Sequence, residues 1–194
     1  MPSKVEMCNN SLQKIGVDSI LDLTDASEAA RRCNQRFDTL LHSLLCIVPW
    51  TFAMARQQLA ANVATPAFEF AYQHTLPSNC LQVLDDYNDY AYRVEGSYIF
   101  SNSTPIKLIY TKIITDMNEL SALFVEMFQF SLAEELAMPL TGSAALQDRM
   151  ERKLRIATRL ARAKDAQQGT PYKMDDGEWI NVRYGNNQSN KVLS

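Results

Sequence analysis

The sequence predicts an α+β fold: a bundle of about four helices with an inserted antiparallel β-sheet and an extended C-terminal arm. Apolar residues recur at three- and four-residue spacing near both ends of the chain, and alternate with polar residues in its middle. The 194 residues are enough for one domain with its own core. We expect a single domain at 1–168, followed by the arm at 169–194.

Two helices are expected before the strands. The first spans residues 3–15, where apolar residues keep a helical spacing until Gly16 ends it. The second spans 26–48, because an acidic residue follows Asp25 by three positions, as in a capping box. Pro49 ends this helix, since the residue before a proline disfavours the helical conformation.

The β insertion is expected at about 50–114, where the apolar period changes to two. Turn-forming residues separate the alternating segments at intervals of about ten residues, which predicts an antiparallel meander. The expected strands lie at 68–72, 80–84, 90–94 and 106–110. The sequence Glu95-Gly96-Ser97 predicts a tight hairpin within 92–99.

Two further helices follow the insertion. Asp116 is the expected cap of the third, at 117–138, which is apolar almost all round and is therefore expected to be central. Pro139 ends it. The fourth, at 143–167, has one apolar stripe: Leu146, Met150, Leu154, Ala157 and Leu160.

The charge of the chain is unevenly distributed. Residues 147–166 carry seven basic and three acidic residues, whereas residues 1–146 carry a net charge of −7. Four arginines of the fourth helix stand at helical spacing: Arg152, Arg155, Arg159 and Arg162. They could bind phosphates of a nucleic acid, remain as a solvated face, or meet the acidic body of a neighbouring copy.

Motifs for catalysis and for cofactors are missing from the sequence. It contains no phosphate-binding loop, no His-Glu-x-x-His, no Gly-x-Ser-x-Gly and no calcium loop. His42 and His74 have no further metal ligand at a suitable spacing. The four cysteines are expected to be reduced. We therefore expect neither enzyme activity nor a cofactor or metal.

Large apolar side chains recur in the polar C-terminal segment from residue 169. Four of them are candidate anchors for a partner: Tyr172, Trp179, Ile180 and Tyr184. A frayed terminus is the alternative. No apolar run approaches the length of about 20 residues that a membrane span needs, and the N-terminus does not suggest a secretory signal.

Several segments, in their order and spacing, resemble the head-to-tail adaptor proteins of short-tailed bacteriophages, also called tail tubular protein A. The similarity covers about residues 5–168. It is carried by Ala29-Ala30-Arg31-Arg32-Cys33-Asn34, Val48-Pro49-Trp50-Thr51-Phe52-Ala53, Phe70-Ala71-Tyr72-Gln73-His74-Thr75-Leu76-Pro77-Ser78-Asn79-Cys80-Leu81, Tyr92-Arg93-Val94-Glu95-Gly96, Leu132-Ala133-Glu134-Glu135-Leu136-Ala137-Met138-Pro139-Leu140-Thr141-Gly142-Ser143 and Ala161-Arg162-Ala163-Lys164-Asp165-Ala166-Gln167.

This resemblance implies a helical bundle with an inserted sheet, and a non-enzymatic structural protein of the virion neck that is assembled in the host cytoplasm. It implies a ring of twelve copies between the portal protein and the tail nozzle (tail tubular protein B), with tail fibres as a further candidate partner. DNA would pass through the lumen without specific binding. No membrane partner is implied.

The resemblance also suggests roles for the candidate residues. The arm would dock on the portal, and the four arginines would contact the next subunit. A loop facing the nozzle or the lumen would carry exposed acids, with Asp85, Asp86, Tyr87 and Asp89 as its candidates. Two alternatives stay open: a nucleic-acid-binding protein that uses the fourth helix, and a tail-associated cell-wall hydrolase. The hydrolase would need paired carboxylates, such as Glu134 and Glu135.

Overall fold

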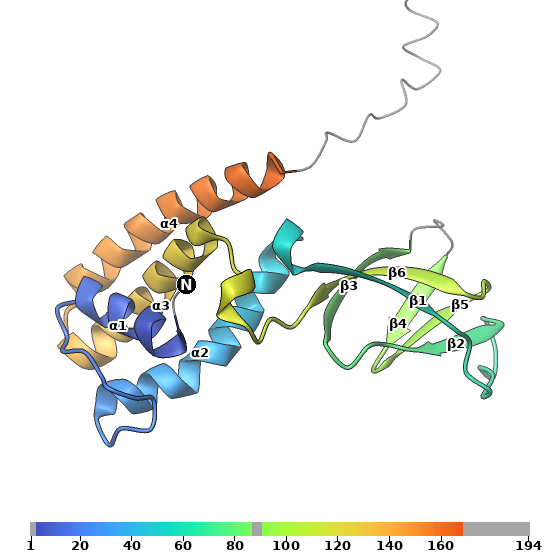
Figure 1. The fold of residues 1–194 in the computed structure, drawn as a ribbon, viewed down its shortest axis with the longest axis horizontal. Coiled ribbons are helices and arrows are strands. Elements are labelled where there is room, and N and C mark those ends of the chain that lie inside the picture. The colour runs from blue at the N-terminus through green and yellow to red at the C-terminus, as the bar shows by residue number, and fades with distance from the viewer. Residues whose placement is uncertain (1–2, 87–90, 169–194) are drawn as a thin grey trace, which may run out of the picture.

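The computed structural model describes residues 3–86 and 91–168, and they form an α+β fold with four α-helices and two small antiparallel sheets. Figure 1 shows the helices gathered at one end of the molecule and both sheets at the other. The helices are α1 (Lys4–Lys14), α2 (Glu28–Ile47), α3 (Ala122–Thr141) and α4 (Ala144–Ala166), with short 3₁₀ turns η1 (Thr51–Ala53) and η2 (Met117–Glu119). All strands within these described residues lie between α2 and α3 in sequence.

Helix α2 begins two residues later than its sequence predicts. The Ser27 hydroxyl oxygen accepts a hydrogen bond from the Ala30 amide at 3.1 Å, so Ser27 is the cap. Asp25, the expected cap, accepts instead from the amides of Leu21 and Asp22 at 2.9 and 3.1 Å. Its carboxylate therefore stabilises the preceding loop.

The third helix differs from its prediction at both ends. Residues 117–119 form η2, with Asp116 as its cap, and α3 proper starts after Ser121. At the other end, Pro139 lies inside the last turn, and the helix continues to Thr141. The Gly142 amide donates to the Met138 carbonyl at 2.9 Å with Gly142 at φ 67°, so this turn closes in spite of the proline.

Helix α3 is central, as its apolar composition predicts, because α1, α2 and α4 all pack against it. Its Phe128 ring contacts Phe37 of α2 with ring centroids 4.7 Å apart. Its Phe124 ring meets Trp50 edge-on at 5.1 Å. These four aromatic side chains are among the largest that are fully buried, so α3 organises the helical core.

The strands form two three-stranded sheets instead of one meander. Their orders are β1-β6-β3 and β2-β5-β4, and all pairs are antiparallel. The strands are β1 (Met54–Leu59), β2 (Tyr72–Thr75), β3 (Cys80–Asp86), β4 (Tyr92–Glu95), β5 (Tyr98–Ser101) and β6 (Ile106–Lys112). Strand β6 buries Ile106, Leu108 and Tyr110, which explains why it takes the central place between β1 and β3.

The predicted hairpin is confirmed, whereas β1 matches no predicted strand and one predicted strand lies later in the chain than expected. Glu95 stands opposite Tyr98 across the two-residue turn between β4 and β5, where Gly96 takes φ 58°. The strand expected at 68–72 begins only at Tyr72, and Phe68 is largely exposed. A second, smaller core lies between the sheets, separate from the helical one, and includes Ile99.

Candidate functional site

The outer face of α4 carries the arginines that the sequence singles out. Met150, Ala157 and Ala161 point towards the core, at the i, i+7, i+11 spacing of one helix face. The structure places Arg152, Arg155, Arg159 and Arg162 on the exposed side of the helix. Leu160, expected on the apolar stripe, is half exposed, because Ala161 takes the core position in that turn.

Most of this positive charge is uncompensated within the described part of the chain. Arg155 forms an ion pair with Glu151 one turn earlier, at 2.6 Å. Across residues 3–86 and 91–168, the side chains of Arg152, Arg159 and Arg162 make no ion pair and no hydrogen bond. A shallow hollow of about 480 Å³ runs along this side of the helix, lined by Glu151, Leu154, Arg155, Thr158, Arg159 and Arg162. The face can therefore receive carboxylates or phosphates.

The C-terminal end of α4 is tied to the start of the β region. The Thr51 hydroxyl donates to Asp165 Oδ1 at 2.7 Å, and the Thr51 amide lies 3.0 Å from Asp165 Oδ2. Asp165 is 6% exposed. These bonds fix α4 at the point where the chain passes from α2 into β1.

A second strip of the outer face of α4 is apolar and basic. Ile156 and Leu160 are 49% and 52% exposed and stand one turn apart. Arg149, Lys153 and Lys164 occupy neighbouring exposed positions on the same side of the helix. Charge counting along the sequence did not reveal this strip, because the exposure of the two apolar residues depends on how α4 sits on α3.

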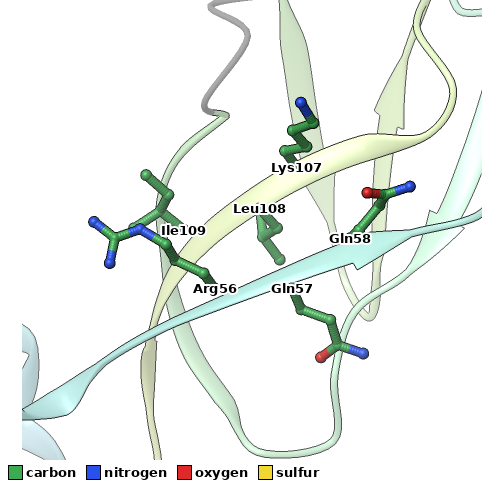
Figure 2. A pocket seen from close by; sticks show the side chains of 6 residues that line it. All are labelled: Arg56, Gln57, Gln58, Lys107, Leu108 and Ile109. Carbon is green, nitrogen blue, oxygen red and sulfur yellow. The ribbon is translucent and has the colours of Figure 1, made fainter.

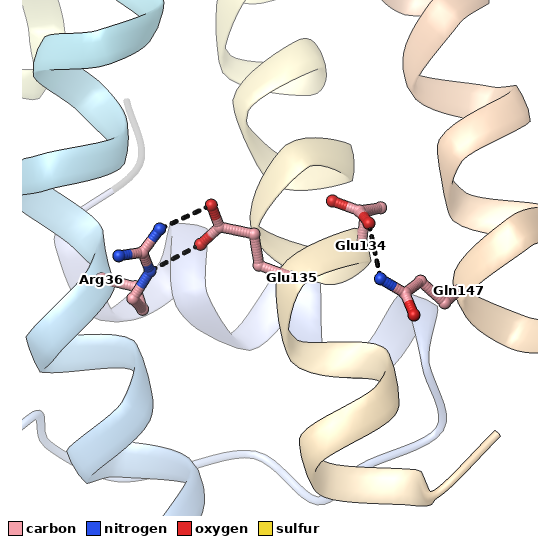
Figure 3. A network of polar contacts seen from close by, with 4 residues as sticks. All are labelled: Arg36, Glu134, Glu135 and Gln147. Atoms are coloured by element: carbon pink, nitrogen blue, oxygen red, sulfur yellow. Dashed lines mark hydrogen bonds and ion pairs between the residues drawn. The ribbon is translucent and has the colours of Figure 1, made fainter. Parts of the chain in front are cut away.

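The candidate carboxylate pair of a hydrolase is divided between two helix contacts (Figure 3). Glu135 accepts two hydrogen bonds of 2.8 Å from the Arg36 guanidinium of α2, which raises the pKa of Arg36. Glu134 accepts from the Gln147 side-chain amide of α4 at 2.8 Å. A hollow of about 370 Å³ lies in this region. Both carboxylates line this hollow, and each is already bound to a neighbouring helix, Glu135 to α2 and Glu134 to α4.

The expected acidic loop is only partly exposed. Asp86 is 1% exposed at the end of β3, and its Oδ1 accepts from the Lys107 amide at 3.3 Å. The expectation that Asp86 is an exposed loop acid is therefore wrong, because Asp86 belongs to β3 and stands opposite the buried Leu108 of β6. Asp85 is exposed. Burial, together with Asp85 and Asp86, raises the pKa of the Tyr92 hydroxyl.

Several predicted site residues lie outside the described residues. These are Tyr87 and Asp89 of the acidic loop, and the arm at 169–194 with Tyr172, Trp179, Ile180 and Tyr184.

A groove on the first sheet was not anticipated from the sequence. It encloses about 270 Å³ and is lined by Arg56, Gln57, Gln58, Lys107, Leu108 and Ile109. Figure 2 shows that these side chains come from the adjacent strands β1 and β6. The lining contains no carboxylate and no thiol. The groove therefore offers contact area and two cationic side chains, Arg56 and Lys107.

Two of the four cysteines meet in the helical core, where a hydrogen bond between the Cys8 and Cys33 thiols raises the pKa of Cys8. His74 is buried with Nε2 3.2 Å from the Ser103 carbonyl oxygen. All four cysteines are free thiols, and Cys8 and Cys33 lie fully buried in the helical core. Among the described residues, no three His, Cys, Asp or Glu side chains are placed to hold a metal ion.

Comparison with known proteins identifies no relative of this chain. No family model and no curated protein matches the chain. Within residues 3–86 and 91–168, no helix is both long and apolar enough to cross a membrane.

Proposed function

We propose that this chain is a head-to-tail adaptor of a short-tailed bacteriophage, a non-enzymatic component of the virion neck. It would form a ring of twelve copies between the portal and the tail nozzle, with the DNA passing through the lumen. The observation that carries the proposal is the architecture. The sequence resemblance implies a helical bundle with an inserted sheet, and the six strands of the described residues are inserted between α2 and α3.

The distribution of charge supports assembly into a ring. Residues 1–146 carry −7, whereas the segment 147–166 carries seven of the 19 basic residues on a largely exposed helix. Contact between the cationic face of one copy and the acidic body of the next would be a head-to-tail interface, which closes into a ring when the rotation per copy permits. Arg152, Arg159 and Arg162 are available for such a contact.

The arm from residue 169 is the proposed portal-binding segment. The bonds between Asp165 and Thr51 fix the place from which the arm leaves the bundle. Aromatic anchors on an arm of this length suit a partner that offers apolar pockets. We expect Tyr172, Trp179, Ile180 and Tyr184 to enter the portal, and Asp85 to face the nozzle or the lumen.

The test measures the mass of the complex with the portal ring. Light scattering on the chain alone and mixed with the portal of the same phage should give a complex near twelve adaptor copies. Replacing the four arm anchors by serine should abolish portal binding while the circular dichroism of the core stays unchanged. A chain truncated after residue 185 keeps all four anchors and is the matched control. A full-length chain that does not bind the portal would overturn the proposal.

A nucleic-acid-binding protein is the second candidate, and the uncompensated arginines of α4 favour it. If α4 bound phosphates, the duplex affinity would be high at low salt and fall steeply as the salt concentration rises. The adaptor proposal expects weak binding throughout, because the DNA has to slide through the lumen. Arg152→Ala and Arg159→Ala should then leave duplex binding unchanged.

A further inference from the structure

The loop between α1 and α2 presents an apolar side chain to solvent on an ordered support. Leu21 is 93% exposed. Its own amide donates to Asp25 Oδ2 at 2.9 Å, and the preceding Ile20 is buried, with its amide bound to Asn9 Oδ1 at 2.8 Å. Because the backbone is held on both sides of Leu21, placing this side chain against a partner costs little ordering entropy.

The surroundings of Leu21 are acidic. Residues 15–27 contain Asp18, Asp22 and Asp25 and no lysine or arginine. Hydrogen bonds from Thr24 lower the pKa of Asp22, which keeps its carboxylate ionised. The loop thus carries one exposed apolar side chain in a segment whose charged residues are all acidic.

The second strip of α4 has the complementary chemistry. Ile156 and Leu160 lie one turn apart, with Cβ atoms about 5–6 Å from each other, so their side chains form one apolar patch onto which a leucine side chain can pack. Arg149 and Lys153 are exposed beside them. Neither cation makes an ion pair or a side-chain hydrogen bond across the described ranges 3–86 and 91–168.

The two surfaces lie on different sides of one molecule. In Figure 1 the loop that joins α1 to α2 hangs from the lower left of the bundle, while α4 forms its upper edge. They cannot meet within one copy. A contact between them joins two different surfaces, so it is heterologous and leaves a free loop and a free α4 strip at the two ends of every pair.

We propose that Leu21 of one copy packs onto Ile156 and Leu160 of a second copy, with Asp18 and Asp22 facing Arg149 and Lys153. A nucleic acid fits this surface less well, since a phosphate backbone gives no apolar partner to Ile156 and Leu160. The contact deepens the proposed function by naming the surfaces between neighbours. Ring closure rests on that function, whereas the pairwise contact does not.

Disulfide trapping tests the contact, in a background in which the half-buried Cys46 and Cys80 are replaced by alanine. The double variant with Leu21→Cys and Leu160→Cys should form a ladder of covalent oligomers under mild oxidation. A mixture of the two single variants should stop at a dimer, because each copy then offers one half of the contact. Val63→Cys, at a fully exposed position of the β region, replaces Leu21→Cys in the control and should give no ladder.

Charge reversal gives an independent measurement on the same protein. Asp22→Lys should reduce the rate of trapping several-fold, and adding Lys153→Asp should restore it. Trapping no faster than in the Val63→Cys control would overturn the proposed contact. Portal binding is measured separately on the untrapped chain. Successful trapping without portal binding would support the contact and contradict the adaptor function. Portal binding without trapping would support the adaptor function and contradict the contact.

Discussion

Replacing Asp165 by alanine tests the anchor between α4 and the β region. The substitution removes the acceptor of the Thr51 amide, in a site where Asp165 is 6% exposed, whereas the Thr51 hydroxyl keeps Gln168 Oε1 as an acceptor at 2.9 Å. A partly buried donor left without its acceptor costs about 1–3 kcal/mol. The higher helix propensity of alanine offsets roughly 0.5 kcal/mol of this loss. We therefore expect the free energy of unfolding to fall by about 2 kcal/mol.

The assay is urea denaturation followed by circular dichroism, with thermal denaturation as a second measurement. For a chain of this length, the expected loss corresponds to a decrease in Tm of roughly 4–8 °C. Asp148→Ala is the matched control, an exposed aspartate of the same helix, and should change the stability by no more than about 0.5 kcal/mol. A loss for Asp165→Ala that is no larger than for this control would refute the assigned role of the carboxylate.

Three further outcomes are expected. Phe128→Ala should cost about 3–5 kcal/mol in urea denaturation, because it empties the centre of the helical core beside Phe37. Arg36→Ala should cost no more than about 1 kcal/mol, and added salt should shrink this difference, since the ion pair with Glu135 is partly exposed. Burial raises the pKa of the Cys80 thiol, so alkylation by iodoacetamide should be slow at neutral pH and accelerate as the pH rises; a fast reaction at neutral pH would contradict this.

Local signals in the sequence predicted the helices well, and their ends less well. The apolar stripe of α2 was predicted from its periodicity, and α3 from its largely apolar composition between capping residues and Pro139. Ser27 replaced Asp25 as a cap because the carboxylate of Asp25 found amides in the preceding loop. Pro139 stayed helical because its turn closes through Gly142. Both outcomes depend on competing local hydrogen bonds, whose balance the residue types alone do not decide.

Strand positions were predictable only in part, since β1 was missed and β2 starts where its predicted segment ends, and strand pairing was not predictable. Alternation indicates that a segment is half buried, whereas it does not indicate which segment lies beside it. The pairing of β6 between β1 and β3 joins residues more than twenty positions apart in sequence. The same pairing places Asp86 in β3 opposite the buried Leu108 of β6, so the error in the candidate loop followed from the error in topology. In α4, by contrast, helical spacing sufficed to place the four arginines on one exposed face.

The place where the β region joins the helices also affects which insertions and deletions the chain tolerates. Met54 at the start of β1 stands opposite Thr111 near the end of β6, so the chain enters and leaves this region at two adjacent points. The two ends of the insertion, where it joins the helical part of the chain, are therefore only about one strand spacing apart, and this distance does not depend on the length of the insertion. An inserted segment of different length or topology could be joined at the same two positions without disturbing α2 or α3. Evolution could thus exchange the tip of the molecule while keeping its helical base.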